Sequence, residues 1–179
     1  IVIAGIVAAG LFWKSIVDNA PKFDPELLYH KESSLIYDMN GNEIKKLAYE
    51  KRENITYEEL PEVLINAIIA TEDSRFFQHN GFDLPRFAVA SFKAVLGQDG
   101  GGASTLTMQV SKNTYTSKAV SIKRKFTDIY MAMFEIEKNH TKQEIIEFYV
   151  NYPYLGGGAY GVEQACQNYF GKSAKDINL

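Results

Sequence analysis

Hydrophobic and polar positions divide the chain into an apolar start and a longer part with helical periodicity. Residues 1–13 carry no polar side chain, and Lys14 ends the run. Thirteen helical residues span roughly 20 Å, which is less than the roughly 30 Å core of a bilayer. We therefore interpret residues 1–13 as the end of a longer transmembrane helix, followed by a connector over residues 14–32. A secretory signal segment and a buried amphipathic helix are the alternatives, and the absence of a polar face disfavours the second.

After the connector the pattern predicts a pair of strands. They are expected over residues 33–38 and 43–49, because the Asn40-Gly41 dipeptide between them is a strong hairpin turn signal. Thr56 and Glu59 then have the spacing of a capping box, which indicates the start of a helical region.

Helices account for most of the remaining chain. The first is expected to deliver Glu72 and Asp73 at its far end. Apolar spacings of 4, 3, 4 and 3 residues between Ile122 and Ile136 predict a long core-facing helix. Further helices are expected over residues 85–96, 141–149 and 162–170. The predicted fold class is mainly α, with one N-terminal β-hairpin.

The helix expected over residues 85–96 is apolar almost all round. Its two charges, Arg86 and Lys93, are seven residues apart and share one face. Such a helix is either buried in a core or lies in a membrane interface with its cations at the headgroups. Both interpretations stay open at this point.

Composition narrows the class of protein. With 179 residues, 46% hydrophobic and 23% charged, the chain is an ordinary globular domain, alone or with a small attachment. A net charge of −3 excludes a general nucleic-acid binder, and a single cysteine, Cys166, excludes an internal disulfide framework and a cysteine zinc cluster. No serine is followed three residues later by lysine and no Lys-Thr-Gly occurs, which excludes a transpeptidase site within this chain.

Three segments have the residue types of a reactive site. Glu72 and Asp73 at a helix end, beside two phenylalanines, suit a general acid or base. The glycine run before Ser104 suits close approach to a phosphate at a helix N-terminus. Lys112 and the cations of residues 122–128 suit an anionic leaving group. Taken singly, each segment is also explained as a solvated helix end, a surface loop or a salt-bridge ladder.

In their order, these segments resemble the motifs of the peptidoglycan glycosyltransferase family, the transglycosylase module of class A penicillin-binding proteins and their monofunctional relatives. The matching motifs are Glu72-Asp73-x-x-Phe76-x-x-His79-x-Gly81, Gly102-Ala103-Ser104-Thr105-Leu106-Thr107-x-Gln109 with Lys112, Arg124-Lys125-x-x-Asp128, and Lys142-x-x-Ile145-x-x-x-Tyr149-x-Asn151. Tyr154-Leu155-Gly156 and Tyr169-Phe170-Gly171-Lys172 extend the resemblance, which runs from the expected hairpin to Lys172.

The resemblance implies a lysozyme-like helical fold with a small membrane-associated jaw, which the helix over residues 85–96 fits. It makes residues 33–179 the glycosyltransferase domain. The implied reaction polymerises lipid II into β-1,4 glycan strands, with inversion and release of undecaprenyl pyrophosphate. The implied partners are lipid II, the growing strand, the membrane, a fused transpeptidase domain beyond Leu179 and other cell-wall proteins, but no nucleic acid. The implied location is the outer face of a bacterial cell membrane, with one membrane span.

The same resemblance assigns roles to individual residues. Glu72 is the implied general base and Asp128 the second catalytic carboxylate. The implied substrate-binding residues are Asp73, Phe76, His79, Ser104, Thr105, Gln109, Lys112, Arg124, Lys125 and Asn151. A Mg²⁺ or another divalent cation bound with the pyrophosphate is a candidate cofactor, with Asp128 its candidate ligand. No organic cofactor is expected.

The chain departs from the family pattern at three places. Asp128 stands where the family has glutamate, which shortens the reach of the carboxylate by roughly 1.5 Å. Glu135, seven residues along the predicted helix, is a weaker substitute. Met108 stands where many members have glutamine, a tolerable change if that position only packs. The family's fifth motif is missing, so we expect a domain that is incomplete at its C-terminus.

Two other functions remain open on the sequence. A lysozyme-like hydrolase or lytic transglycosylase would also use a glutamate at a helix end, although it has no pyrophosphate for the cations to hold. A non-catalytic membrane scaffold of the cell-wall machinery would need none of these side chains.

Overall fold

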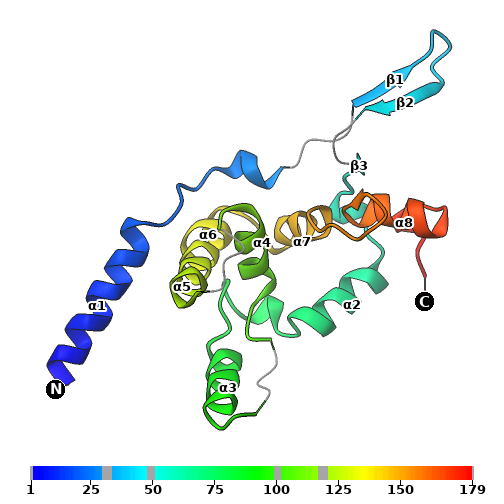
Figure 1. Cartoon of the computed structure of the whole chain (residues 1–179). Helices are drawn as coiled ribbons and strands as arrows, with labels where there is room; N and C mark the ends of the chain where they lie inside the picture. The colour runs from blue at the N-terminus through cyan, green and yellow to red at the C-terminus, as the bar shows by residue number, and fades with distance from the viewer. Residues whose placement is uncertain (1, 30–33, 48–50, 99–101, 117–120, 179) are drawn as a thin grey trace. The chain divides into compact units, whose positions relative to one another are not determined.

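The computed structural model describes residues 2–29, 34–47, 51–98, 102–116 and 121–178. The fold is mainly helical, as predicted (Figure 1). The chain forms two compact units, each built from two separate stretches. Unit 1 comprises Ile1–Asp24 and Arg75–Thr141, and unit 2 comprises Pro25–Ser74 and Lys142–Leu179.

Unit 1 contains helices only, among its described residues. They are α1 Val2–Asp18, η3 Phe76–Gln78, α3 Leu84–Val95, α4 Leu106–Thr114, α5 Ile122–Tyr130, η4 Met131–Ile136 and α6 Glu137–Asn139. Unit 2 contains short strands as well. Its elements are η1 Pro25–Leu28, β1 Ser34–Tyr37, β2 Glu43–Leu47, β3 Lys51–Arg52, η2 Tyr57–Glu59, α2 Glu62–Glu72, α7 Lys142–Asn151, β4 Ala159–Tyr160, α8 Val162–Phe170 and η5 Ala174–Asp176.

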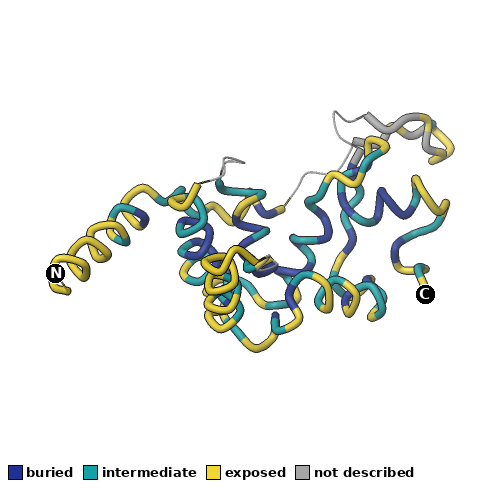
Figure 2. The backbone as a smooth tube through the Cα atoms, turned by 60° about the horizontal axis from the view of Figure 1, so that its bottom comes forward, coloured by how far each residue is buried: buried dark blue, intermediate teal, exposed yellow. Residues whose placement is uncertain are grey.

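The apolar start of the chain is helical, but α1 continues five residues past Trp13, to Asp18. An ion pair one turn apart, between Lys14 and Asp18 at 2.8 Å, supports this last turn. Figure 2 shows the N-terminal helix exposed along most of its length, and only Ile16 in it is buried. In the described part of the chain, no helix combines the length and the apolar character that a membrane crossing needs.

The long helix predicted between Ile122 and Ile136 is continuous but not uniform. Its first part is α-helical, and η4 is a π-helix of six residues in the middle. A π turn is wider than an α turn, so it changes which residues face the core. Ile122, expected to face the core, is 74% exposed, whereas Met131 and Ala132 are fully buried.

Gly81 allows the backbone of the π-helix η4 to pack closely against the loop after η3. Its backbone has φ +80°, and a Cβ built there would lie 2.8 Å from the carbonyl carbon and oxygen of Ala132. The turn after η3 therefore packs directly on the backbone of η4, and only glycine allows that approach.

The core of unit 1 lies between α4, α5 and η4. Met108, Ile129 and Ala132 form a buried cluster, with Phe82, Phe126 and Met133 packed around it. Met108 is 1% exposed, so its side chain serves for packing in this chain.

The sequence left open whether α3 is buried in the core, and the structure shows that it is not. All of its residues are described, and none is buried. The exposed apolar side chains are Leu84, Val89, Phe92 and Val95, followed by Leu96 after the helix end. Asp83 caps the helix by accepting the backbone N–H of Arg86. Phe87 contacts Phe82 at 5.2 Å between ring centroids, whereas these exposed side chains face away from the protein core.

In unit 2, β1 pairs antiparallel with β2 across the turn that contains Gly41. β3 pairs in parallel with β4, and the guanidinium of Arg52 lies 5.1 Å from the ring centroid of Tyr160. The capping box of Thr56 and Glu59 is confirmed, although it caps η2 and the longer helix α2 starts only at Glu62.

Candidate active site

Two motifs that are about twenty residues apart meet in unit 1. Lys125 on α5 donates a hydrogen bond from Nζ to Oγ of Ser104, just before α4. Lys112 on α4 is exposed, and its charge acts on Lys125. We call Ser104, Lys112, Arg124 and Lys125 the cationic cluster. This arrangement presents three positive charges and a hydroxyl group within one unit.

Asp128 lies within this cluster and is held from three sides. Its Oδ2 accepts from the guanidinium of Arg124, one helical turn earlier, as the sequence spacing predicted. Its Oδ1 accepts from the hydroxyls of Thr116, at 2.7 Å, and Ser111, at 3.4 Å. The Asp128 side chain is 2% exposed. These three hydrogen bonds fix the carboxylate in place.

The electrostatics of the cluster follow from burial. Burial raises the pKa of the Asp128 carboxyl above its ordinary value, against the opposing hydrogen bond from Thr116 and the charge of Arg124. Burial also lowers the pKa of the Lys125 ammonium, with Arg124 and Lys112 adding to the effect and Asp128 opposing it. A dianionic ligand would relieve the mutual repulsion of these cations.

The surroundings of Asp128 do not fit a divalent cation held by the protein. Magnesium needs carboxylate or carbonyl oxygens that are free to coordinate it. Both oxygens of Asp128 already accept hydrogen bonds, and the charged neighbours Arg124 and Lys125 are cations. We therefore assign no catalytic step to a metal ion at Asp128.

Glu72 is the last residue of α2, at the helix end that the sequence predicted. It belongs to unit 2. It is half-buried, and Asp73 after it is fully buried and ends the helix. Tyr149 on α7 lies within the electrostatic reach of Glu72. Burial and the negative charge of Glu72 raise the pKa of Tyr149 to about 12. The phenol therefore stays protonated beside the predicted general base at neutral pH.

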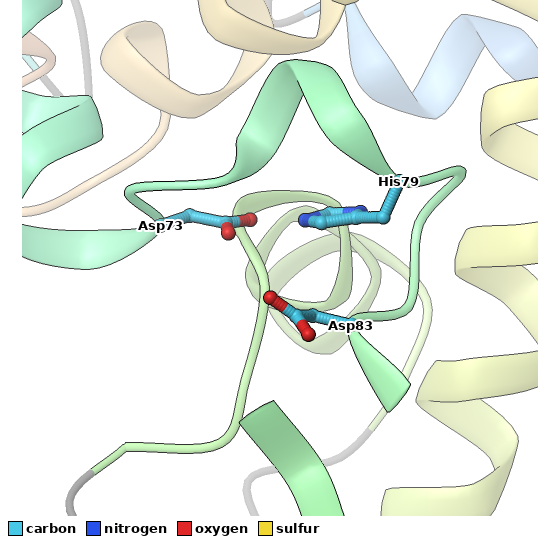
Figure 3. A group of neighbouring side chains, drawn as sticks. All are labelled: Asp73, His79 and Asp83. Carbon is cyan, nitrogen blue, oxygen red and sulfur yellow. The ribbon is translucent and has the colours of Figure 1, made fainter. Parts of the chain in front are cut away.

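The rest of the first motif shapes a turn. Figure 3 labels Asp73, His79 and Asp83 along this turn, and His79 and Asp83 both belong to unit 1. Phe76 is fully buried, and its ring lies 6.3 Å from that of His79. Arg75 donates from Nε to Asp83 at 2.8 Å, and this ion pair lowers the pKa of Asp83.

The pocket beside His79 and Asp83 measures about 190 Å³, which is below the roughly 300 Å³ at which ligand pockets start. It is therefore too small to be a disaccharide site. In the structure, His79 contacts Phe76 and Asp83 pairs with Arg75, so both side chains stabilise the turn between α2 and α3.

Thr105 connects the second motif to the first. Its hydroxyl donates to the carbonyl of Gly81 at 2.6 Å and accepts the backbone N–H of Met108 as the cap of α4. Thr105 is fully buried, so it fixes the start of α4 against the turn. Gln109, one turn further along α4, is half-buried.

Asn151 closes α7 from inside unit 2. Its side-chain oxygen accepts the backbone N–H of Ile55 at 3.0 Å, and its amide donates to the carbonyl of Ile55 at 2.8 Å. Its own carbonyl accepts from Arg52. The buried amide therefore braces the segment before η2, and its predicted contact with substrate stays a prediction.

The structure adds residues that the sequence did not single out. Thr116 and Ser111 hold Asp128, and nothing in their spacing from Asp128 indicated it. Tyr149 had a signal, because it lies within the fourth motif, but its nearness to Glu72 depends on how α7 packs. Glu135, considered as a substitute for Asp128, lies in η4 and accepts a hydrogen bond from Tyr130 at 3.0 Å.

Comparison with known proteins gives a consistent set of relatives. A family model described as Transglycosylase matches residues 40–179. Penicillin-binding protein 1A/1B of Bacillus subtilis (strain 168) is 39% identical over 172 residues, which cover 94% of this chain and 18% of that protein. Penicillin-binding protein 1A of Streptococcus oralis is 40% identical over 181 residues, covering 99% of this chain and 28% of that protein. Penicillin-binding protein 1A of Aquifex aeolicus (strain VF5) is 37% identical over 185 residues, covering 100% and 25%. The chain thus spans well under a third of the length of these relatives.

Proposed function

The chain belongs to the transglycosylase family, the peptidoglycan glycosyltransferases, and from this premise we propose that it polymerises lipid II. In this reaction the 4-hydroxyl oxygen of an acceptor sugar forms a bond to the anomeric carbon of the donor strand. The bond from that carbon to the pyrophosphate breaks with inversion, so the product is a β-1,4 linkage. Undecaprenyl pyrophosphate leaves with the bonding electron pair.

Glu72 takes the proton of the attacking hydroxyl group in this proposal. A general base must be ionised and positioned beside the proton it accepts. The protonated phenol of Tyr149 lies near this carboxylate and does not compete for that role, because its pKa of about 12 keeps it from acting as a base at neutral pH.

The observation that carries the proposal is the cationic cluster. Lys125 donates to Ser104 of the second motif, and the charges of Lys112 and Arg124 both act on Lys125. Cations from two motifs are therefore close together in one unit. Positive charge aimed at a developing anion lowers the barrier of the step that forms it. A hydrolase that cuts finished glycan produces no pyrophosphate and needs no such cluster.

We assign α3 to the membrane-associated jaw of a lysozyme-like fold. Its exposed apolar side chains include Val89, Phe92 and Val95, at 56%, 66% and 84% exposure. Helix residues of this kind insert into the boundary between headgroups and acyl chains. A lipid-linked substrate is then handled at the outer face of a bacterial membrane, with α1 as part of the anchor. The growing glycan strand and a fused transpeptidase domain are the further partners we propose.

The decisive experiment replaces Glu72 by glutamine and supplies lipid II to the full chain in detergent micelles. Loss of the base should lower the polymerisation rate by about 10²- to 10⁴-fold. The matched control is Glu62→Gln, which removes an exposed carboxylate at the other end of the same helix. The products are separated by size, and released undecaprenyl pyrophosphate is measured.

Two outcomes would contradict the proposal. Cleavage of finished peptidoglycan in place of polymerisation would favour the lytic alternative. Equal polymerisation by wild type and Glu72→Gln would remove the assigned base, and no polymerisation by the wild type would favour a scaffold.

A further inference from the structure

The end of α1 is joined to α5 and η4 by aromatic rings. Phe12 meets Phe126 edge to face at 5.3 Å between ring centroids. Trp13 meets Tyr130 and Phe134 edge to face, each at 6.4 Å. Tyr130 and Phe134 stack on each other at 5.6 Å. We call these five residues the aromatic joint. All of them lie in unit 1.

The burial of α1 is concentrated at this joint. Ile3, Ile6 and Leu11 are 78%, 68% and 64% exposed, whereas Trp13 is half-buried and Ile16 fully buried. α1 is therefore held by its last turns, and the contact lies close to the end of the apolar run.

Two rings of the joint, Phe126 and Tyr130, lie on α5, the helix that also carries Arg124, Lys125 and Asp128. Phe126 and Tyr130 are each two residues from Asp128, which places them about 200° round α5 from that carboxylate. The Asp128 side of α5 is held to α4 through Ser111, and the other side rests on α1. α5 is thus clamped between α1 and α4.

We propose that the aromatic joint sets the position of α5, and that Phe12 and Trp13 are positioning residues for the cationic cluster. This inference rests on the proposed function, because it assigns the cluster to the pyrophosphate of the donor. Cations stabilise a leaving group well only when they are held in place before the reaction. α5 continues directly into η4, which packs on the turn of Gly81, so the far end of α5 is fixed there. Its first part, which carries Arg124 and Lys125, takes its position from α1 and α4. The apolar anchor segment thereby becomes part of the machinery that binds the leaving group.

The inhibition constant for inorganic pyrophosphate tests the joint. It does not depend on the fraction of folded enzyme, so a loss of stability alone would not change it. In the full chain, Trp13→Ala should raise this constant about fivefold, and Trp13→Phe should restore it to within about twofold, because an edge-to-face ring contact is kept. Leu11→Ala is the matched control, since it shortens an exposed side chain on the same helix.

Trp13 also offers a second readout, because it is the only tryptophan in the chain. Tyr130→Ala removes a ring that meets Trp13, so it should shift the emission of Trp13 and raise the inhibition constant for inorganic pyrophosphate together. Both signals together support the proposal.

The outcomes separate this inference from the proposed function. Normal polymerisation with equal inhibition constants for Trp13→Ala and Leu11→Ala would overturn the positioning role alone. A shift of Trp13 emission in Tyr130→Ala with an unchanged inhibition constant for pyrophosphate would overturn it as well. No polymerisation by the wild type would remove the proposed function, and this inference with it.

Discussion

Asp128 is the residue whose chemistry depends most on its surroundings. Three donors hold its two oxygens, and the charge of Arg124 stands against the cost of burial. Burial is the stronger effect, because the pKa of the carboxyl is raised and not lowered. The carboxylate therefore orients Arg124 at a cost in stability, which is what a residue kept for function would show.

This raised pKa predicts how stability depends on pH. The folded chain binds the Asp128 proton more tightly than the unfolded chain does. The protonated Asp128 therefore stabilises the fold fully below the ordinary carboxyl pKa of about 3.9. This stabilisation is lost as the pH rises through the raised pKa of the folded state. The free energy of unfolding of the wild type, relative to Asp128→Asn, should fall over that interval. Urea denaturation at a series of pH values measures it, and a difference that grows with pH would show that the pairing with Arg124 outweighs burial.

Gly81 makes a second prediction at the residue scale. Alanine there would be strained by φ +80° and would clash with the backbone of Ala132 at 2.8 Å. We expect Gly81→Ala to lower the free energy of unfolding by roughly 3 kcal/mol or more, which combines the left-handed strain and overpacking.

Gly97 in the same unit is the control for this change. It has φ +70°, and a Cβ added there would meet no atom within 4 Å, so Gly97→Ala should cost only the roughly 1–2 kcal/mol of backbone strain. Urea denaturation of both variants isolates the contact with η4. Equal losses would mean that this close approach is not maintained in solution.

At the scale of elements, local signals predicted the helices well. The capping box of Thr56 and Glu59 is used before η2, and α2 ends with Glu72 as expected. The π-helix was beyond prediction, because apolar spacing in η4 fits an α-helix equally well. Its wide turn depends on the contact between Ala132 and Gly81, which lie far apart in the sequence.

Some contacts of the site residues follow from local sequence, and others depend on tertiary packing. The pairing of Arg124 with Asp128 follows from helical spacing and could be predicted. The contact between Lys125 and Ser104 needed the packing of α5 against the start of α4. Thr105 and Asn151 were assigned to substrate by resemblance, but their side chains bond to backbone groups, which no motif reveals.

Asn151 carries the prediction for α7. Its amide satisfies both backbone groups of Ile55, and its loss leaves two buried polar groups without a partner. Asn151→Ala should lower the free energy of unfolding by roughly 2–4 kcal/mol, and the Ile55 amide should exchange its hydrogen faster. Asn178→Ala, which removes an exposed amide in the same unit, is the control. If stability is unchanged while activity is lost, Asn151 acts on substrate and not as a brace.

At the scale of the whole molecule, the two units are interleaved along the chain. Unit 1 uses residues before and after the first stretch of unit 2, and unit 2 resumes only at Lys142. α1 accordingly packs on α5 more than a hundred residues later. Contacts of such long sequence separation slow folding. A cut at any of the three boundaries splits at least one unit, so neither unit can be taken out as one continuous fragment.

Because α3 is exposed, its stability as a helix depends on the solvent around it. A helix of twelve residues is marginal in water, and no residue of α3 is buried to support it. The cap from Asp83 and the ring contact between Phe87 and Phe82 stabilise its first half. Its order therefore depends on the solvent, and adding a micelle or bilayer should increase the helical signal of the protein in circular dichroism. In the proposed membrane-bound state, lipid would supply the apolar contacts that the protein core does not give to α3.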